Sequence, residues 1–129
     1  MEDGSMLERS DKELEIYSYT GDGYEPTMNY GGWRVAIANY SERFDKDKYR
    51  RIERHTLTDE VFVLLSGKAS LVIGKELKET ELEAGKIYNV KAGAYHNILL
   101  RKDAKVLIVE NHNTGIENTE YFEIGGDAE

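Results

Sequence analysis

Residues 54–67, with the sequence RHTLTDEVFVLLSG, decide the fold that we predict for this chain. A histidine and an acidic pair stand before a nearly unbroken apolar run, and a glycine ends it. Alternate side chains of a strand point to opposite faces, so Glu60, Phe62 and Leu64 share one face. A buried carboxylate is costly unless it is protonated, paired or bound to a cation. Glu60 therefore either caps the preceding turn in water or points inward with a chemical role.

Short segments rich in Val, Ile, Leu and Tyr recur along the chain, and turn-like stretches such as SGK, EAGK and HNTG separate them. About eight short strands at this spacing are typical of an antiparallel sandwich or barrel. The predicted strands are 33–40, 49–55, 60–66, 69–74, 86–91, 95–100, 105–111 and 120–124. A single helical turn within 41–49, capped by Ser41, is the main helical candidate after residue 40.

The pattern predicts one all-β domain over residues 1–129. Within it we expect an N-terminal arm at 1–30, a barrel at 31–124 and a tail at 125–129. The arm should pair at a sheet edge or with a second subunit, and residues 1–10 and 125–129 should fray. Strands that are apolar on both faces need a cover beyond one small barrel, which favours a homodimer.

Composition limits the function classes. The chain has no cysteine, which excludes disulfide scaffolds, thiolate zinc sites and thiol nucleophiles. A net charge of -8 argues against a nucleic-acid partner, because phosphate binding needs clustered cations. No apolar stretch is long enough for a membrane span, and the first residues do not resemble a signal peptide. We therefore expect a cytoplasmic protein with no membrane partner.

A local group of basic residues lies just before and within the second predicted strand: Lys46, Lys48, Arg50, Arg51 and Arg54. Acidic residues are interleaved with them, so we interpret the group as a solvated face.

Two spacing motifs carry a family resemblance. The first is Glu53-x-His55, four residues, Glu60, six residues, Gly67; the second is Gly85, five residues, Lys91-Ala92-Gly93, two residues, His96. Together they resemble the two motifs of the cupin superfamily. The resemblance implies a small, jelly-roll-like barrel of the double-stranded β-helix type. The chain departs from the family pattern where Glu53 replaces the first histidine, Lys91 replaces a proline and Leu100 replaces an asparagine, and the leading glycine of the first motif is missing.

The resemblance implies metal ligands at His55, Glu60 and His96, with Glu53 as an optional fourth. Two imidazoles and one carboxylate with open positions suit Fe(II) and also accept Mn(II), Ni(II), Zn(II) or Co(II). A second carboxylate would favour harder ions such as Mn(II). We therefore expect a divalent transition metal as the cofactor.

Each of these residues also has a purely structural interpretation. His55 would hydrogen-bond at the barrel mouth, Glu60 would cap its turn, and Glu53 would pair with Arg51 or Arg54. The chain has three histidines, and two of them occupy ligand positions of the two motifs, which favours metal binding. The third, His112, is interpreted as a loop residue.

Three functions follow from such a site. The first is a metal-dependent enzyme of dioxygenase, isomerase or lyase type that acts on a small, polar, oxygen-rich molecule. The second is a non-catalytic module that binds or senses a small ligand without metal. The third is a structural homodimer with a vestigial pocket. The sequence contains no P-loop, dinucleotide fingerprint or nucleophile elbow.

Strand parity also predicts the lining of the pocket. The apolar walls are expected from Phe62, Leu64, Ile98 and Leu100. Aromatic surfaces or polar tips near the ligand are expected from Trp33, Tyr49, Tyr88 and Tyr95, for which ordinary packing is the alternative.

Overall fold

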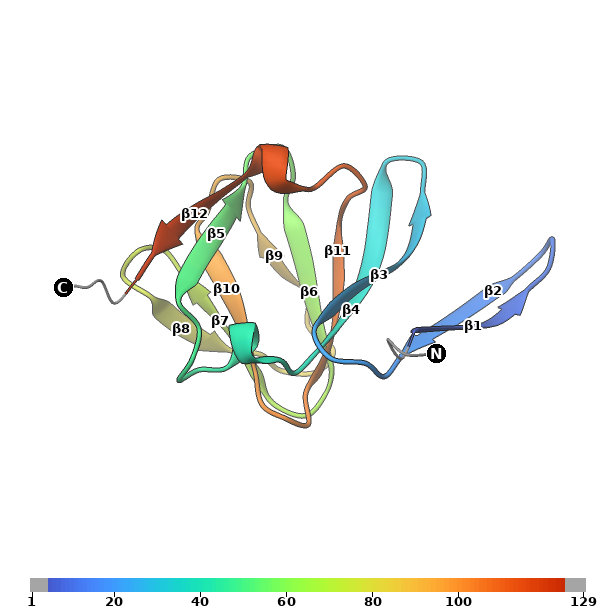
Figure 1. Cartoon of the computed structure of the whole chain (residues 1–129), viewed down its shortest axis with the longest axis horizontal. Helices are drawn as coiled ribbons and strands as arrows, with labels where there is room; N and C mark the ends of the chain where they lie inside the picture. Colours follow the sequence, from blue (N-terminus) through green and yellow to red (C-terminus); the bar gives the residue numbers. More distant parts are fainter. Residues whose placement is uncertain (1–4, 125–129) are drawn as a thin grey trace.

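The computed structural model describes residues 5–124, which form an all-β molecule with two short 3-10 helices (Figure 1). The strands are β1 (Ser5–Ser10), β2 (Glu15–Tyr19), β3 (Tyr24–Tyr30), β4 (Trp33–Asn39), β5 (Arg51–His55), β6 (Glu60–Ser66), β7 (Ala69–Ile73), β8 (Lys78–Glu81), β9 (Tyr88–Val90), β10 (His96–Leu100), β11 (Lys105–Asn111) and β12 (Thr119–Glu123). The helices are η1 (Glu42–Phe44) and η2 (Ile116–Asn118). Across the described part of the chain, no helix has the length and apolar character needed to cross a membrane.

Two five-stranded antiparallel sheets carry the fold (Figure 1). One has the strand order β12-β5-β10-β7-β8, and the other has the order β3-β4-β11-β6-β9. The main core lies between them and includes Phe62 and Ile108 from one sheet and Leu71 and Ile98 from the other. A smaller cluster of Ile52, Val72 and Leu99 lies on the outer face of the first sheet. The predicted all-β class is confirmed.

Side-chain alternation decides what faces the core. In β6, Glu60, Phe62 and Leu64 are buried, whereas Val61 and Val63 are only half-buried. In β10, Ile98 and Leu100 are buried in the main core. The parity prediction that Phe62, Leu64, Ile98 and Leu100 face the interior is therefore confirmed, because each belongs to the cluster between the sheets. Only Phe62 and Ile98 of these four line the cavity described below.

Within one chain, the apolar outer face of β6 is only partly covered. Val61 and Val63 are half-buried, and Leu65 is 47% exposed. A solvated antiparallel sheet is normally polar on its outer face, so this apolar strip fits the homodimer, which stays a prediction. We expect light scattering to give a mass near twice the 14.7 kDa of one chain, and a monomeric mass would contradict the dimer.

The N-terminal region contains three strands that the sequence analysis did not predict. β1 and β2 pair as a separate two-stranded sheet, which projects away from the two large sheets (Figure 1). β3 is an edge strand, where Pro26 is tolerated because a bulge lies beside it. The predicted fraying was wrong for residues 5–10, which form β1, and the remainder of that prediction lies outside the described residues.

Candidate metal centre

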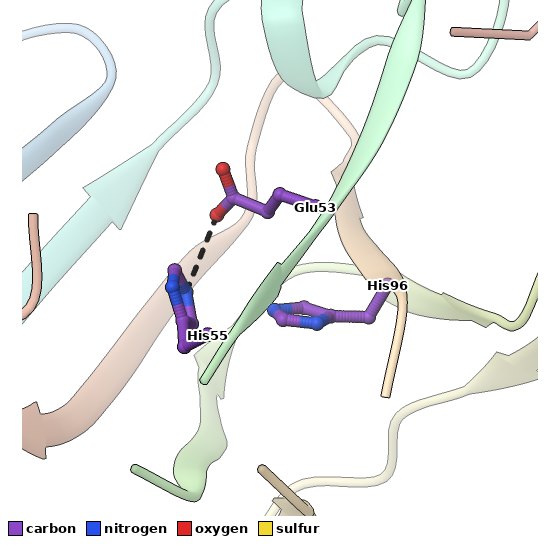
Figure 2. A group of neighbouring side chains, drawn as sticks. All are labelled: Glu53, His55 and His96. Atoms are coloured by element: carbon purple, nitrogen blue, oxygen red, sulfur yellow. Dashed lines mark ion pairs between the residues drawn. The ribbon is translucent and has the colours of Figure 1, made fainter. Parts of the chain in front are cut away.

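The two spacing motifs converge on the inner side of the sheets. β5 presents Glu53 and His55 on one face, β6 begins with Glu60, and β10 begins with His96. The backbone register pairs His96 directly with Glu53 across β10 and β5. Figure 2 shows Glu53, His55 and His96 turned toward a common point, with the carboxylate of Glu53 reaching the ring of His55. Residues of the first motif, from β5 and β6, and His96 of the second motif therefore form one site.

Glu60 stands between the two imidazole rings. Its Oε1 atom lies 2.8 Å from Nε2 of His96 and 2.9 Å from Nε2 of His55. Oε2 of Glu53 lies 3.5 Å from the same nitrogen of His55. The rings of His55 and His96 meet edge to face, with their centroids 5.4 Å apart. His55, Glu60 and His96 are each at most 6% exposed, so the cluster is shielded from bulk water.

The opposite nitrogens of the two rings fix their orientation. Nδ1 of His96 lies 3.0 Å from the carbonyl oxygen of Ala94, which can only accept, so this nitrogen carries a hydrogen. Nδ1 of His55 contacts Oγ1 of Thr119 at 3.0 Å. Both Nε2 atoms are thereby directed inward, as a metal ligand requires. Nε2 of His55 is buried and, among residues 5–124, makes no contact with hydrogen-bond geometry.

The electrostatics of the cluster are those of a buried ion-pair network. Burial alone would lower the pKa of His55, but the carboxylates of Glu53 and Glu60 outweigh it and raise the pKa to about 10. Burial likewise opposes a charge on His96, yet Glu60 raises its pKa. Burial would raise the pKa of Glu60, but the two imidazoles lower it to about 2. Without a cation, His55 therefore carries a positive charge at neutral pH and Glu60 is ionised, while His96 holds its second proton more tightly than a free imidazole does.

A second polar group borders the first and was missed by the sequence analysis. Glu110, which is 6% exposed, accepts hydrogen bonds through Oε2 from the hydroxyl of Tyr24 and from Nη2 of Arg34, the latter at 2.9 Å. Its other oxygen, Oε1, lies 4.0 Å from Nε2 of His55. Burial, together with the charge of Glu60, raises the pKa of Glu110 against the lowering effect of Tyr24 and Arg34.

Strand parity indicates that Glu110 faces inward, and the sheet register then places Arg34 beside it. Glu110 follows Val106 and Ile108 on the inward face of β11, just as Glu60 shares a face with Phe62. Arg34 pairs with Glu110 in the register between β4 and β11. Tyr24 carries no comparable signal, because the pairing of β3 with β4 is interrupted by a bulge.

The polar groups surround a cavity of about 240 Å³. Its inner wall is apolar and includes Phe44, Phe62, Ile98 and Ile108. Its outer wall includes Ile116 and Tyr121, which are 82% and 40% exposed, so the cavity reaches the surface.

The four aromatic residues considered for the ligand site lie outside the cavity, in agreement with the packing interpretation. Trp33 is exposed beside Tyr30, and Tyr95 packs against Phe122 outside the cavity. Tyr88 instead accepts a hydrogen bond from the backbone of Glu83, and Tyr49 packs with the outer cluster. The aromatic hydroxyls that do line the cavity come from Tyr24 and Tyr121.

The overall architecture has counterparts among solved structures. A cupin-2 domain protein from Shewanella frigidimarina superposes with a TM-score of 0.57 at 16% identity, over 73% of this chain and 85% of that one. Pac13 from Streptomyces, described as a unique nucleoside dehydratase, superposes with a TM-score of 0.61 at 7% identity, over 78% of this chain and 77% of that one. The chain has the cupin fold.

A further cupin-like neighbour is KdgF from Halomonas sp., with a TM-score of 0.51 and 11% identity over 68% of this chain and 76% of that one. The sequence matches no protein-family model and no curated protein. At these identities, the likeness establishes the cupin fold and leaves function to the residues of the site.

The donor groups of this cupin fold fit a divalent ion. Metal–ligand distances of about 2.1 Å place neighbouring ligands about 3 Å apart and opposite ligands about 4.2 Å apart in octahedral geometry. The separations around Nε2 of His55 run from 2.9 Å to Glu60, through 3.5 Å to Glu53, to 4.0 Å to Glu110. In two overlapping triads all donor atoms lie within 4.8 Å of one another: Glu53, His55 and His96, and His55, Glu60 and Glu110.

Of the structural interpretations, that of His55 holds, because its Nδ1 atom contacts Oγ1 of Thr119, whereas those of Glu60 and Glu53 do not. Glu60 does not cap its turn, because Asp59 accepts the bonds from Asn89 and the backbone of Ala92 there. Glu53 does not pair with Arg54, whose guanidinium lies 2.6 Å from Glu120. The metal-ligand roles themselves stay predictions.

Proposed function

We propose that this chain binds one divalent transition-metal ion through His55, Glu60 and His96, with Glu53 as a further ligand. We further propose that it is a metal-dependent enzyme of dioxygenase, isomerase or lyase type acting on a small, polar, oxygen-rich molecule. The observation that carries the proposal is the convergence of carboxylate oxygens on the buried Nε2 atom of His55. Glu60, Glu53 and Glu110 lie 2.9, 3.5 and 4.0 Å from this atom, yet none of them makes a hydrogen bond of good geometry with it. Several anionic oxygens gathered around one inward-facing imidazole nitrogen form a donor set that a divalent cation would satisfy.

The cavity supports a catalytic role. It places a polar donor set beside an apolar wall and reaches the surface, which is the usual form of a small-molecule site. A bound ion would act as a Lewis acid on a substrate oxygen. Phe44, Phe62 and Ile98 would exclude water from that position, because they form the buried wall of the cavity. Pac13, which is described as a nucleoside dehydratase, is a cupin-like neighbour with enzymatic activity.

The second candidate is a binding module without metal, and one observation favours it. Glu60 already accepts a hydrogen bond of 2.8 Å from His96, so protein donors partly satisfy its charge. With both imidazoles protonated, the charges of His55 and His96 balance those of Glu53 and Glu60. Such a site would hold a neutral ligand in the cavity rather than an ion.

Elemental analysis of protein purified without chelator separates the two candidates. The enzyme proposal expects about one transition-metal ion per chain. It also expects fast water exchange at the ion when Mn(II) is loaded, measured by water-proton relaxation, because substrate needs an open coordination position. Protein that stays free of metal, both as purified and after incubation with Mn(II), Fe(II) or Zn(II), would instead support the binding module.

Metal uptake should release protons at neutral pH, because an imidazole that holds two protons must lose one to bind a metal. The pKa of His55 is raised to about 10, so neutral pH lies below its titration, and the pKa of His96 is raised as well. Affinity should therefore rise with pH, by roughly 10-fold per pH unit from His55 alone between about pH 6 and pH 8, and more steeply where His96 is also protonated.

Calorimetric titrations in buffers of different ionisation enthalpy measure the protons released. His112→Ala provides the control, because its exposed side chain lies outside the cavity lining and should leave the proton count unchanged. Release near zero would mean that the imidazoles are already neutral in the metal-free protein.

A further inference from the structure

A surface groove of about 510 Å³ adjoins the cavity. The two hollows share four lining residues: Arg43, Glu53, Asn97 and Tyr121. Glu53 therefore faces both, and a molecule lying in the groove has a direct route to the imidazole rings.

Strand β5 links the groove to the cavity in a straight line. Arg51, Glu53 and His55 alternate with outward-facing residues and so share one face of the strand. At about 3.3 Å per residue, Arg51 and His55 lie about 13 Å apart along the strand. Arg51 lines the groove and His55 lines the cavity, so the two ends of this row mark the span of a single bound molecule.

Basic side chains outnumber acidic ones in the groove, although the whole chain carries a net charge of -8. The basic residues of its lining are Arg43, Lys48, Arg50 and Arg51, and the acidic ones are Glu42, Glu53 and Glu123. These include part of the basic group that the sequence analysis interpreted as a solvated face. That interpretation fits Lys46, which lies 3.3 Å from Glu79, and Arg54, which pairs with Glu120.

The three arginines of the groove, unlike Lys46 and Arg54, have no carboxylate partner among the described residues. Within residues 5–124, Arg43, Arg50 and Arg51 make no ion pair with a carboxylate, whereas Lys48 lies 3.4 Å from Glu42. Two of the guanidinium groups are instead held by aromatic faces. The guanidinium carbon of Arg43 lies 4.6 Å from the ring centre of Phe44, and that of Arg51 lies 3.8 Å from the ring centre of Tyr121.

Stacked guanidinium groups without a carboxylate partner are suited to binding an oxyanion. Stacking restricts the planar fork, so less freedom is lost when it binds a carboxylate or phosphate through two hydrogen bonds. The four basic residues of the lining exceed its three acidic ones, so the groove has a small net positive charge on an otherwise acidic protein.

We propose that the groove is a binding subsite for an oxyanion group, carboxylate or phosphate, on a substrate whose other end enters the cavity. Arg43 and Arg51 bind the oxyanion, and the oxygen-bearing end reaches His55, Glu60 and His96. The subsite stands on the groove itself, while the role of the far end rests on the proposed metal-dependent function. The substrate class is therefore an anionic molecule with a span on the order of 10 Å between its two polar ends.

The test follows the side-chain Nε–Hε signals of arginine by NMR in full-length, chelator-treated protein. Inorganic phosphate is titrated in one series and acetate in another. We expect the Arg43 and Arg51 signals to move together and saturate with one dissociation constant. Stronger binding of phosphate identifies a phosphoryl group as the anion, and binding of acetate at least as strong identifies a carboxylate. Absence of a saturating shift with both anions would overturn the subsite.

Matched variants separate specific binding from general surface charge. Arg43→Gln and Arg51→Gln should each weaken binding by about three- to tenfold, and Arg51→Lys should lie between wild type and Arg51→Gln because it keeps the charge without the fork. Arg101→Gln removes the same charge from an exposed site outside the groove and should leave the constant unchanged. Equal weakening by Arg101→Gln would overturn the proposal. Thermal unfolding of each variant verifies that it is folded.

This titration is independent of metal, so its failure would leave the metal proposal intact, and a metal-free protein would leave the subsite intact. A final measurement links the two. In Mn(II)-loaded protein, bound phosphate should show faster phosphorus relaxation that Arg43→Gln reduces together with binding. Phosphate that binds the groove without this enhancement would show that groove and cavity do not share a substrate.

Discussion

Replacement of His96 by alanine is expected to reduce the metal content of the purified protein from about one ion per chain to near zero. The variant removes one of the two nitrogens next to Oε1 of Glu60, which lies 2.8 Å from it. Loss of one protein ligand should weaken affinity by more than about 100-fold, since removal of outer partners of a metal ligand alone costs 10- to 100-fold. Elemental analysis of both proteins, purified side by side without chelator, gives the comparison.

His112→Ala is the matched control, because it also removes a histidine but from an exposed turn. It should retain the full metal content. His96→Gln supplies a second variant that fills more of the buried space, and circular dichroism reports whether each variant is folded. Full metal content in both folded His96 variants would contradict the proposed centre.

Gly67→Ala is expected to produce the largest loss of stability among alanine substitutions at the described glycines. Gly67 directly follows β6 and has a φ of 74°, where an alanine is strained. A Cβ atom there would lie 2.5 Å from the carbonyl oxygen of Asp103 and 2.6 Å from Cα of Ala104. Backbone atoms cannot move aside as a flexible side chain does, so we expect a loss of about 3 kcal/mol or more in the free energy of unfolding.

Gly74→Ala separates the two causes of that loss. Gly74 has a similar φ of 78°, but nothing among the described residues lies within 4 Å of an added Cβ atom. It should cost only about 1 kcal/mol, the contribution of the backbone conformation. Urea unfolding of the two variants measures the difference, and equal losses would show that crowding at Gly67 is unimportant.

The sequence predicted the parts of the fold that alternation and apolar runs encode. β6, β10 and β11 have buried inner faces, and their segments were assigned within about a residue at each end. β8 was missed because all of its residues, Lys78 to Glu81, are exposed at a sheet edge, where charge replaces the apolar signal. β1 and β2 were missed for a related reason, since this hairpin lies outside both large sheets.

Motif spacing predicted only those residues of the candidate site that belong to the two motifs. His55, Glu60 and His96 lie at family positions, and the structure brings them together. Arg34 and Glu110 were missed because their proximity depends on the register between β4 and β11, which are more than sixty residues apart in sequence. Spacing along the chain does not encode that register. The groove arginines were misinterpreted because the chain alone does not show which cations lack a carboxylate.

Because Glu60 lies between the imidazole rings of His55 and His96, we expect the protein to fold whether or not a metal ion is bound. Zinc fingers unfold when their ion is withdrawn, because metal binding supplies the free energy that folds them. Here the hydrogen bond from His96 to Glu60 and the anchoring of both Nδ1 atoms keep the empty pocket organised. The native chain should therefore survive extraction by a chelator and accept a different ion afterwards, so that the supply of metal in its surroundings selects the occupant.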